Sequence, residues 1–122
     1  MVGFVSAALA AGQPVVENQA WCFGSGLRVI FEEDHARPEI RITTVIEGGS
    51  AGETGADRGV AHLAEHLWFR STPEGAGGDV WSAVGNQGGR LNGATTRDRT
   101  EFTTVVPRKA LETALLLEAA RL

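Results

Sequence analysis

The sequence lacks the residues that several kinds of site require. Cys22 is the single cysteine, which excludes a disulfide within the chain and any cysteine-rich metal site. No apolar run approaches the length of a membrane-spanning helix, so we expect no membrane span. The 15 acidic residues outnumber the 11 basic ones, and the net charge of −4 gives no electrostatic support for binding nucleic acid.

Enough apolar residues are present for one folded domain. The 122 residues are 43% hydrophobic and 21% charged, which is ordinary for a soluble globular protein with a sizeable core. Alternating patterns predict strands at 27–33 and 40–46, which are expected to pair as a hairpin, and a further strand can begin at 21–23. The remaining patterns predict helices at 60–70, 80–87 and 108–122 and strands at 90–95 and 100–106.

This order, β-β-α-α-β-β-α, predicts an α+β fold in which a mixed, mainly antiparallel sheet packs against helices. In the helix at 80–87, Trp81 and Val84 are expected to face the core. In the last helix, leucines are expected to line one side and acidic residues the more polar side, namely Leu111, Leu115 and Leu122 against Glu112 and Glu118.

Residues 1–20 are expected to be a leader or a remnant of a signal peptide, followed by a linker. Residues 1–13 are apolar and end in small residues, and Ala8-Leu9-Ala10 has the form of a signal-peptidase site. The basic segment of a signal peptide is missing, because the first Lys or Arg is Arg28, so a disordered or strand-forming leader is the alternative. The leader predicts a periplasmic or secreted location, with a cytoplasmic one as the alternative.

Three residues of the helix predicted at 60–70 carry the chemistry. His62, Glu65 and His66 form the pattern H-x-x-E-H, known as the inverzincin motif. Residues three and four apart share one face of a helix, so the two imidazoles can occupy two corners of a zinc tetrahedron. The carboxylate is too close along the helix to be an obvious third ligand, but it can reach a water molecule and serve as the base in metal-assisted hydrolysis.

The alternative interpretation is that both histidines are half-buried and hydrogen-bonded to neighbours, since a pattern with three fixed positions also occurs by chance. Apolar residues flank the motif on nearly all sides, which indicates a buried helix. Polar groups on a buried helix need partners, and a metal ion would satisfy the two histidines together.

Two stretches resemble the signatures of the pitrilysin/insulysin family of zinc metallopeptidases, which includes the mitochondrial processing peptidases. The first is Gly59–Thr72, although Ser71 stands where the family usually has Gly. The second is Gly88–Phe102, where a Gly-Gly pair, Asn92 with a small residue after it, a Thr and an Asp-x-Thr-x-aromatic run follow in the family's order. The resemblance covers about residues 24–122.

The resemblance implies a zinc metalloendopeptidase with one zinc ion per complete site. His62 and His66 would be metal ligands and Glu65 the catalytic base, so residues 21–122 would be the N-terminal portion of the catalytic domain, a metallopeptidase-like half domain. In the family the third ligand is a Glu on a later helix, expected beyond Leu122, and neither Glu112 nor Glu118 matches its position. The resemblance therefore predicts a truncated, inactive fragment that lacks a C-terminal portion or partner domain.

The family also implies a polypeptide substrate, bound in extended form as an added strand at a sheet edge. The matching segment is around Leu91–Thr95, with four candidate substrate-binding residues, Asn92, Gly93, Ala94 and Thr95. Shaping the end of a strand is the alternative role for Asn92 and Ala94.

Two other functions stay open. One is a non-catalytic scaffold or interaction subunit of the same fold, like the family's core subunits of respiratory complexes. Such subunits typically lose the metal residues, whereas this chain has His62, Glu65 and His66. The other is an unrelated α+β domain with a chance H-x-x-E-H motif, which the match over Asn92–Phe102 disfavours.

Overall fold

A computed structural model describes residues 19–74 and 78–121. The chain divides into two units, 1–37 and 38–122, each of which is described by itself. In the first unit, β1 (Gln19–Cys22) pairs antiparallel with β2 (Arg28–Phe31). The predicted leader lies outside the described residues except for its last two positions. Within the described ranges, no helix has the length and apolar character needed to cross a membrane.

The predicted hairpin between residues 27–33 and 40–46 is wrong. β2 pairs with β1 because a tight turn brings them together: the Phe23 N–H donates to the Leu27 carbonyl at 2.8 Å, and Gly26 has the positive φ of 91° that the turn requires. β3 (Glu39–Ile46) instead pairs along its full length with β5 (Thr100–Pro107). Alternation identified the strands, but it contains no information about which strand is the partner.

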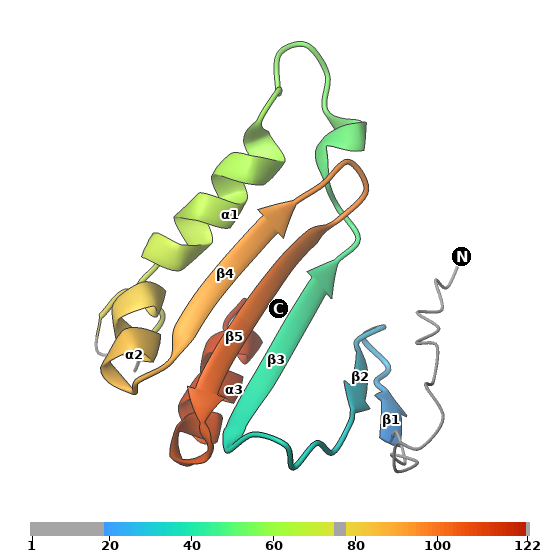
Figure 1. The fold of residues 1–122 in the computed structure, drawn as a ribbon. Helices are drawn as coiled ribbons and strands as arrows, with labels where there is room; N and C mark the ends of the chain where they lie inside the picture. Colours follow the sequence, from blue (N-terminus) through green and yellow to red (C-terminus); the bar gives the residue numbers. More distant parts are fainter. Residues whose placement is uncertain (1–18, 75–77, 122) are drawn as a thin grey trace. The chain divides into compact units, whose positions relative to one another are not determined.

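The second unit contains a three-stranded sheet in the order β3-β5-β4, with β4 at Arg90–Thr95 (Figure 1). Both strand pairs are antiparallel, which confirms the mainly antiparallel sheet. β4 is an edge strand: it pairs with β5 on one side, and no strand of the described part of the chain pairs with its other side. Its outer backbone N–H and C=O groups are thus left for another strand.

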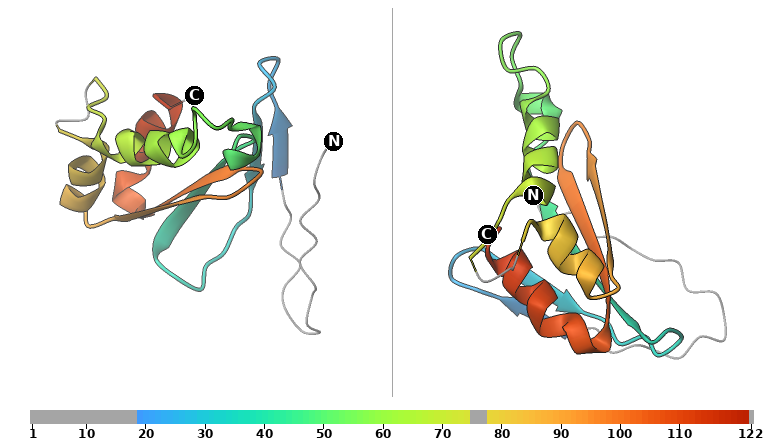
Figure 2. Two further views of the ribbon diagram at one scale, coloured as in Figure 1. Left: turned by 90° about the horizontal axis from the view of Figure 1, so that it is seen from above. Right: turned by 90° about the vertical axis from the view of Figure 1, so that its left-hand side faces the viewer.

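Three helices cover one face of this sheet: α1 (Val60–Arg70), α2 (Val80–Asn86) and α3 (Leu111–Ala119) (Figures 1 and 2). Short 3-10 turns precede α1 and α3, at Ser50–Gly52 and Arg108–Ala110. The buried core lies between helices and sheet and is made of Val80, Ala83, Val84, Val106, Ala110, Ala114 and Leu117. The fold class is therefore the α+β arrangement that the sequence predicts.

The predicted core side of the last helix is wrong. Leu111 and Leu115 are exposed, whereas Ala114, Leu117 and Glu118 are buried; Leu122 lies outside the described residues. α3 is apolar on nearly every side, so its periodicity did not specify a face. The buried side is instead the one on which Glu118 finds hydrogen-bond donors in the sheet. Trp81 is likewise more exposed than predicted, at 54%, because it packs by one edge on Phe69, while Val84 is buried as expected.

Gly89, which precedes β4, permits the close approach of α2 to the sheet. A Cβ atom there would lie 2.7 Å from a methyl carbon of Val84 and 2.8 Å from the backbone oxygen of Val105. We therefore expect Gly89→Ala to lower the free energy of unfolding by about 1–3 kcal/mol, because an inserted methyl group overpacks the core. The measurement is the urea midpoint of the purified chain.

Gly85→Ala is the matched control, since Gly85 lies inside α2 with open space where its Cβ would stand. This second change should leave stability unaltered or raise it by up to about 1 kcal/mol, as alanine favours a helix. Equal urea midpoints for the two variants would contradict the packing described here.

Candidate metal centre

Helix α1 carries the three motif residues and begins at a well-defined cap. Gly59 has a φ of 89°, and the carboxylate of Glu53 accepts the backbone N–H groups of Gly59 and Ala61 at 2.8 and 2.9 Å. These two bonds hold the pKa of Glu53 below its usual value. At the other end, Ser71 replaces the usual glycine by donating its hydroxyl to the Trp68 carbonyl at 2.7 Å. The helix bounds of 60–70 are those predicted from the sequence.

The two histidines lie side by side on the exposed surface of α1. Nε2 of His62 is 3.1 Å from Nε2 of His66, and the ring centroids are 4.6 Å apart. Two imidazole nitrogens that bind one tetrahedral zinc ion, each at 2.0–2.1 Å, are separated by roughly 3.3 Å. The spacing and the exposure of these nitrogens therefore fit two ligands of a zinc ion.

Glu65 lies on the side of α1 that packs against β4. Its side chain is buried, and its Oε2 accepts a hydrogen bond of 2.5 Å from the hydroxyl of Thr95. Its Oε1 faces Gly93, where an added Cβ would lie 2.7 Å from this oxygen. The carboxylate thus occupies a space that β4 leaves free for it, next to the exposed histidines on the same helix.

The four candidate substrate-binding residues of β4 are divided between the two faces of the sheet. Gly93 and Thr95 face α1, whereas Asn92 and Ala94 are exposed on the face that no helix of the described residues covers. Strand alternation requires this division, since successive side chains point to opposite faces. What the four residues share is the outer backbone edge of β4.

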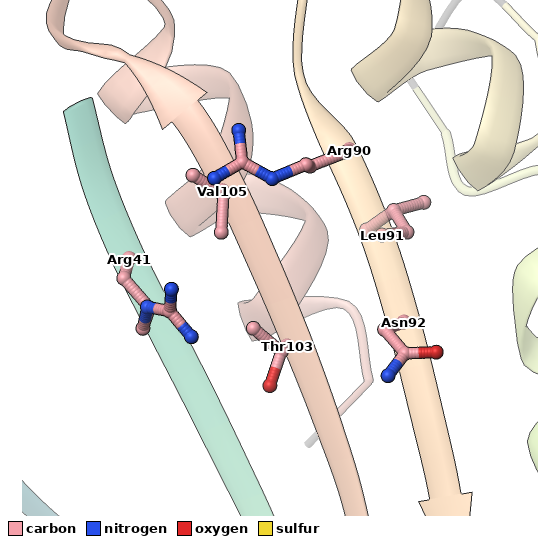
Figure 3. Close-up of a pocket in the computed structure, with 6 residues that line it drawn as sticks. All are labelled: Arg41, Arg90, Leu91, Asn92, Thr103 and Val105. Carbon is pink, nitrogen blue, oxygen red and sulfur yellow. The ribbon is translucent and has the colours of Figure 1, made fainter.

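The open face has a shallow hollow of about 210 Å³ around Asn92 (Figure 3). Its lining comes from all three strands and consists of Arg41, Arg90, Leu91, Asn92, Thr103 and Val105. Arg90 makes a bidentate ion pair with Glu39, with a shortest distance of 3.0 Å. Because the hollow is on this open face, it lies on the opposite side of the sheet from the histidines of α1.

No group of three or more His, Cys, Asp or Glu residues that could hold a metal ion occurs in 19–74 and 78–121. Glu118 has other partners: it accepts hydrogen bonds from Thr44 at 2.6 Å and Thr104 at 3.0 Å and pairs with Arg121 at 3.2 Å. Glu112 is exposed on α3. The fit to zinc is thus that of a two-histidine half site.

Sequence reasoning did not identify the buried network around Glu118 or the contact between Thr95 and Glu65. The guanidinium of Arg121 lies 3.8 Å from the ring centroid of Phe102, and burial lowers the pKa of Arg121 to about 10. Hydroxyl and carboxylate pairs far apart in the chain leave no periodic signal, so only the fold reveals them.

Comparison with known proteins identifies the family. Residues 28–119 match the family model described as insulinase, peptidase family M16. The chain belongs to this insulinase family. It is 33% identical over 88 residues to the β subunits of the mitochondrial-processing peptidases of Blastocladiella emersonii and Homo sapiens, an alignment that covers 72% of this chain and 19% and 18% of those proteins.

Two further similar proteins show the same partial coverage. Subunit 1 of the bovine cytochrome b-c1 complex is 31% identical over 90 residues, 74% of this chain and 18% of that subunit. A protease from Helicobacter pylori superimposes with a TM-score of 0.73 at 25% identity, over 84% of this chain and 25% of the protease. The chain spans about a fifth of the length of the curated relatives it matches.

The comparisons correct one prediction. The mitochondrial-processing peptidase β subunits and subunit 1 of the cytochrome b-c1 complex are mitochondrial proteins, so the periplasmic or secreted location predicted from the N-terminus is wrong. Small residues after an apolar segment are a weak signal, and the basic segment that would have made it specific is missing.

The ion pair of Glu118 allows a test of whether this residue has a structural role or binds metal. We expect Glu118→Ala to lower the free energy of unfolding by about 3 kcal/mol, because it leaves the Arg121 guanidinium buried without its partner. Zinc uptake should not change. Urea unfolding and metal analysis check the two expectations, with Glu112→Ala at the exposed surface as the control, expected within about 0.5 kcal/mol of the unmodified chain. Loss of zinc uptake in Glu118→Ala would contradict this assignment.

Proposed function

We propose that this chain supplies two zinc ligands, the catalytic base and the substrate-binding strand of a zinc metalloendopeptidase. The observation that carries the proposal is the pair of Nε2 atoms 3.1 Å apart on the exposed side of α1, beside a buried carboxylate. Membership of a peptidase family supports it. His62 and His66 would hold the zinc ion, and one ion would serve each complete site.

The chemistry follows from these groups. A zinc ion held there would polarise the scissile carbonyl and lower the pKa of a water molecule. Glu65 takes the proton from that water and returns it to the leaving amine. His62 and His66 would hold the ion as neutral imidazoles, the form in which histidine is a metal ligand.

The substrate is an extended polypeptide that adds to the outer edge of β4. Backbone groups of Asn92, Gly93, Ala94 and Thr95 form this edge, and main-chain pairing accepts many side chains. Because β4 also contacts the metal helix through Gly93 and Thr95, a strand bound at this edge lies close to α1.

The complete site needs a third protein ligand, which we assign to a glutamate outside these 122 residues. A catalytic zinc usually has three protein ligands and one open position. The matched relatives are about five times longer than the segment they share with this chain, which supports a contribution from a further segment or a partner subunit. The 122 residues alone are then inactive.

The second candidate function is a non-catalytic scaffold or interaction subunit of the same fold. The similarity to subunit 1 of the cytochrome b-c1 complex favours it. The presence of His62, Glu65 and His66 favours the peptidase, since a scaffold requires none of them. Zinc uptake and its dependence on His66 distinguish the two functions.

With two ligands, the 122-residue chain should bind zinc weakly. Metal analysis after dialysis should give well under one zinc per chain, because solvent must fill the remaining positions. His66→Ala should abolish the uptake that is measurable at higher zinc concentration, whereas His35→Ala, in an exposed loop, should not. Stoichiometric zinc that resists a chelator would place a third ligand within these residues.

In the complete protein, Glu65→Gln should show whether Glu65 is the catalytic base or a zinc ligand. Glutamine keeps the size of the side chain but cannot accept the proton, so zinc stays bound while peptide hydrolysis falls by at least about a hundredfold. His62→Ala or His66→Ala should lose both metal and activity. Zinc content and hydrolysis of a peptide are measured together, with Glu112→Gln as the control. A Glu65→Gln protein that remains fully active would exclude the proposed mechanism.

A further inference from the structure

We infer that Thr95 is a positioning residue for Glu65, and that Gly93 provides the space in which the Glu65 carboxylate is held. This inference rests on the proposed function, in which Glu65 is the base. It assigns to Thr95 and Gly93 a task on the helix side of β4, in addition to the backbone edge that they share with Asn92 and Ala94.

The Thr95 hydroxyl donates a short hydrogen bond to the Glu65 side chain. Thr95 Oγ1 and Glu65 Oε2 are 2.5 Å apart, at the short end of the range for hydrogen bonds between oxygen atoms. Glu65 is only 6% exposed, so this donor replaces water that the carboxylate has lost. A donor on Oε2 restricts rotation of the carboxylate and leaves Oε1 as its other acceptor.

The position of Oε1 is set by the absence of a side chain at Gly93. A Cβ there would lie 2.7 Å from Oε1 and 2.9 Å from a ring carbon of Phe69. Phe69 follows Glu65 by one helical turn and is itself packed edge-on against Phe102, with centroids 5.7 Å apart. Gly93 therefore leaves open the space that Oε1 occupies, while Thr95 holds the other carboxylate oxygen.

This arrangement connects the base to the substrate-binding strand. Thr95 and Gly93 belong to β4, whose outer edge would hold the substrate, so one hydrogen bond fixes Glu65 relative to the peptide bond to be cleaved. A base held in place needs less reorganisation in the transition state. Thr95 should therefore affect turnover more than substrate binding, whereas a merely structural threonine would affect neither selectively.

The first experiment compares Thr95→Val and Thr95→Ser in the complete, zinc-loaded protein. Valine keeps the shape but removes the hydroxyl, so kcat for a peptide should fall about tenfold or more while KM and zinc content change less than about twofold. Serine restores the donor and should keep kcat within about threefold. Thr43→Val, the same change at an exposed position of β3, is the control and should change nothing. Full activity in Thr95→Val, or no rescue by serine, would overturn the inference.

The second experiment needs no activity and uses the 122-residue chain. Thr95→Val should lower the folding equilibrium constant about tenfold, because a buried carboxylate loses its donor. When Glu65→Met is already present, the same change should cost less than about twofold, and the difference is the coupling between the two side chains. Equal costs in both backgrounds would show that Thr95 does not hold Glu65.

The two experiments separate this inference from the proposed function. If the complete protein hydrolyses no peptide, or if Glu65→Gln is as active as the unmodified protein, the proposed function fails and positioning by Thr95 fails with it, even where the folding cycle shows coupling. If Glu65→Gln is inactive but Thr95→Val is not, the proposed function stands and only the inference about Thr95 fails.

Discussion

The close approach of α1 to β4 is the constraint on which the candidate site depends. Gly93 has no side chain, so the Glu65 carboxylate can enter the interface and meet the hydroxyl of Thr95 at 2.5 Å. Burying a carboxylate is costly unless a donor compensates it, so helix and strand must meet in one register. Glu65 is buried at this contact, whereas His62 and His66 on the same helix are exposed.

A second buried carboxylate fixes the other side of the helical layer. Glu118 joins α3 to β3 and β5 through hydrogen bonds from Thr44 and Thr104. Arg121 forms an ion pair with Glu118, and its guanidinium stacks on the ring of Phe102. Phe102 in turn contacts Phe69 of α1. Two carboxylates held by threonines thus locate the first and last helices on the same sheet. Only one of them lies beside residues that could hold a metal.

Local patterns predicted where the helices and strands lie. Contacts between residues far apart in the chain decide which strands pair and which side of a helix is buried, and these could not be predicted. The bounds of α1 and β4 were predicted to the residue, because apolar periodicity and glycine positions are local signals. The predicted partner of β2 was wrong, because the turn at Gly24-Ser25-Gly26 is no stronger a signal in the sequence than the turn that ends at Pro38. The core side of α3 was wrong because its partners, Thr44 and Thr104, lie far away in the chain. For the candidate site, the motif predicted which residues share a helix, but not that Glu65 is held by Thr95.

The residues of α1 differ in how much they contribute to the fold, in a chain that is similar both to proteins named as peptidases and to a respiratory-complex subunit. His62 and His66 are exposed, and the hydrogen bond that joins them links them to each other rather than to the core. Replacing them would remove little buried surface, so the fold does not depend on these two histidines. Glu65 differs, because it is buried and bonded to the sheet, and its loss would alter the packing of α1. The two exposed histidines therefore contribute little to the fold, and their 3.1 Å spacing is the feature that the proposed zinc site would use.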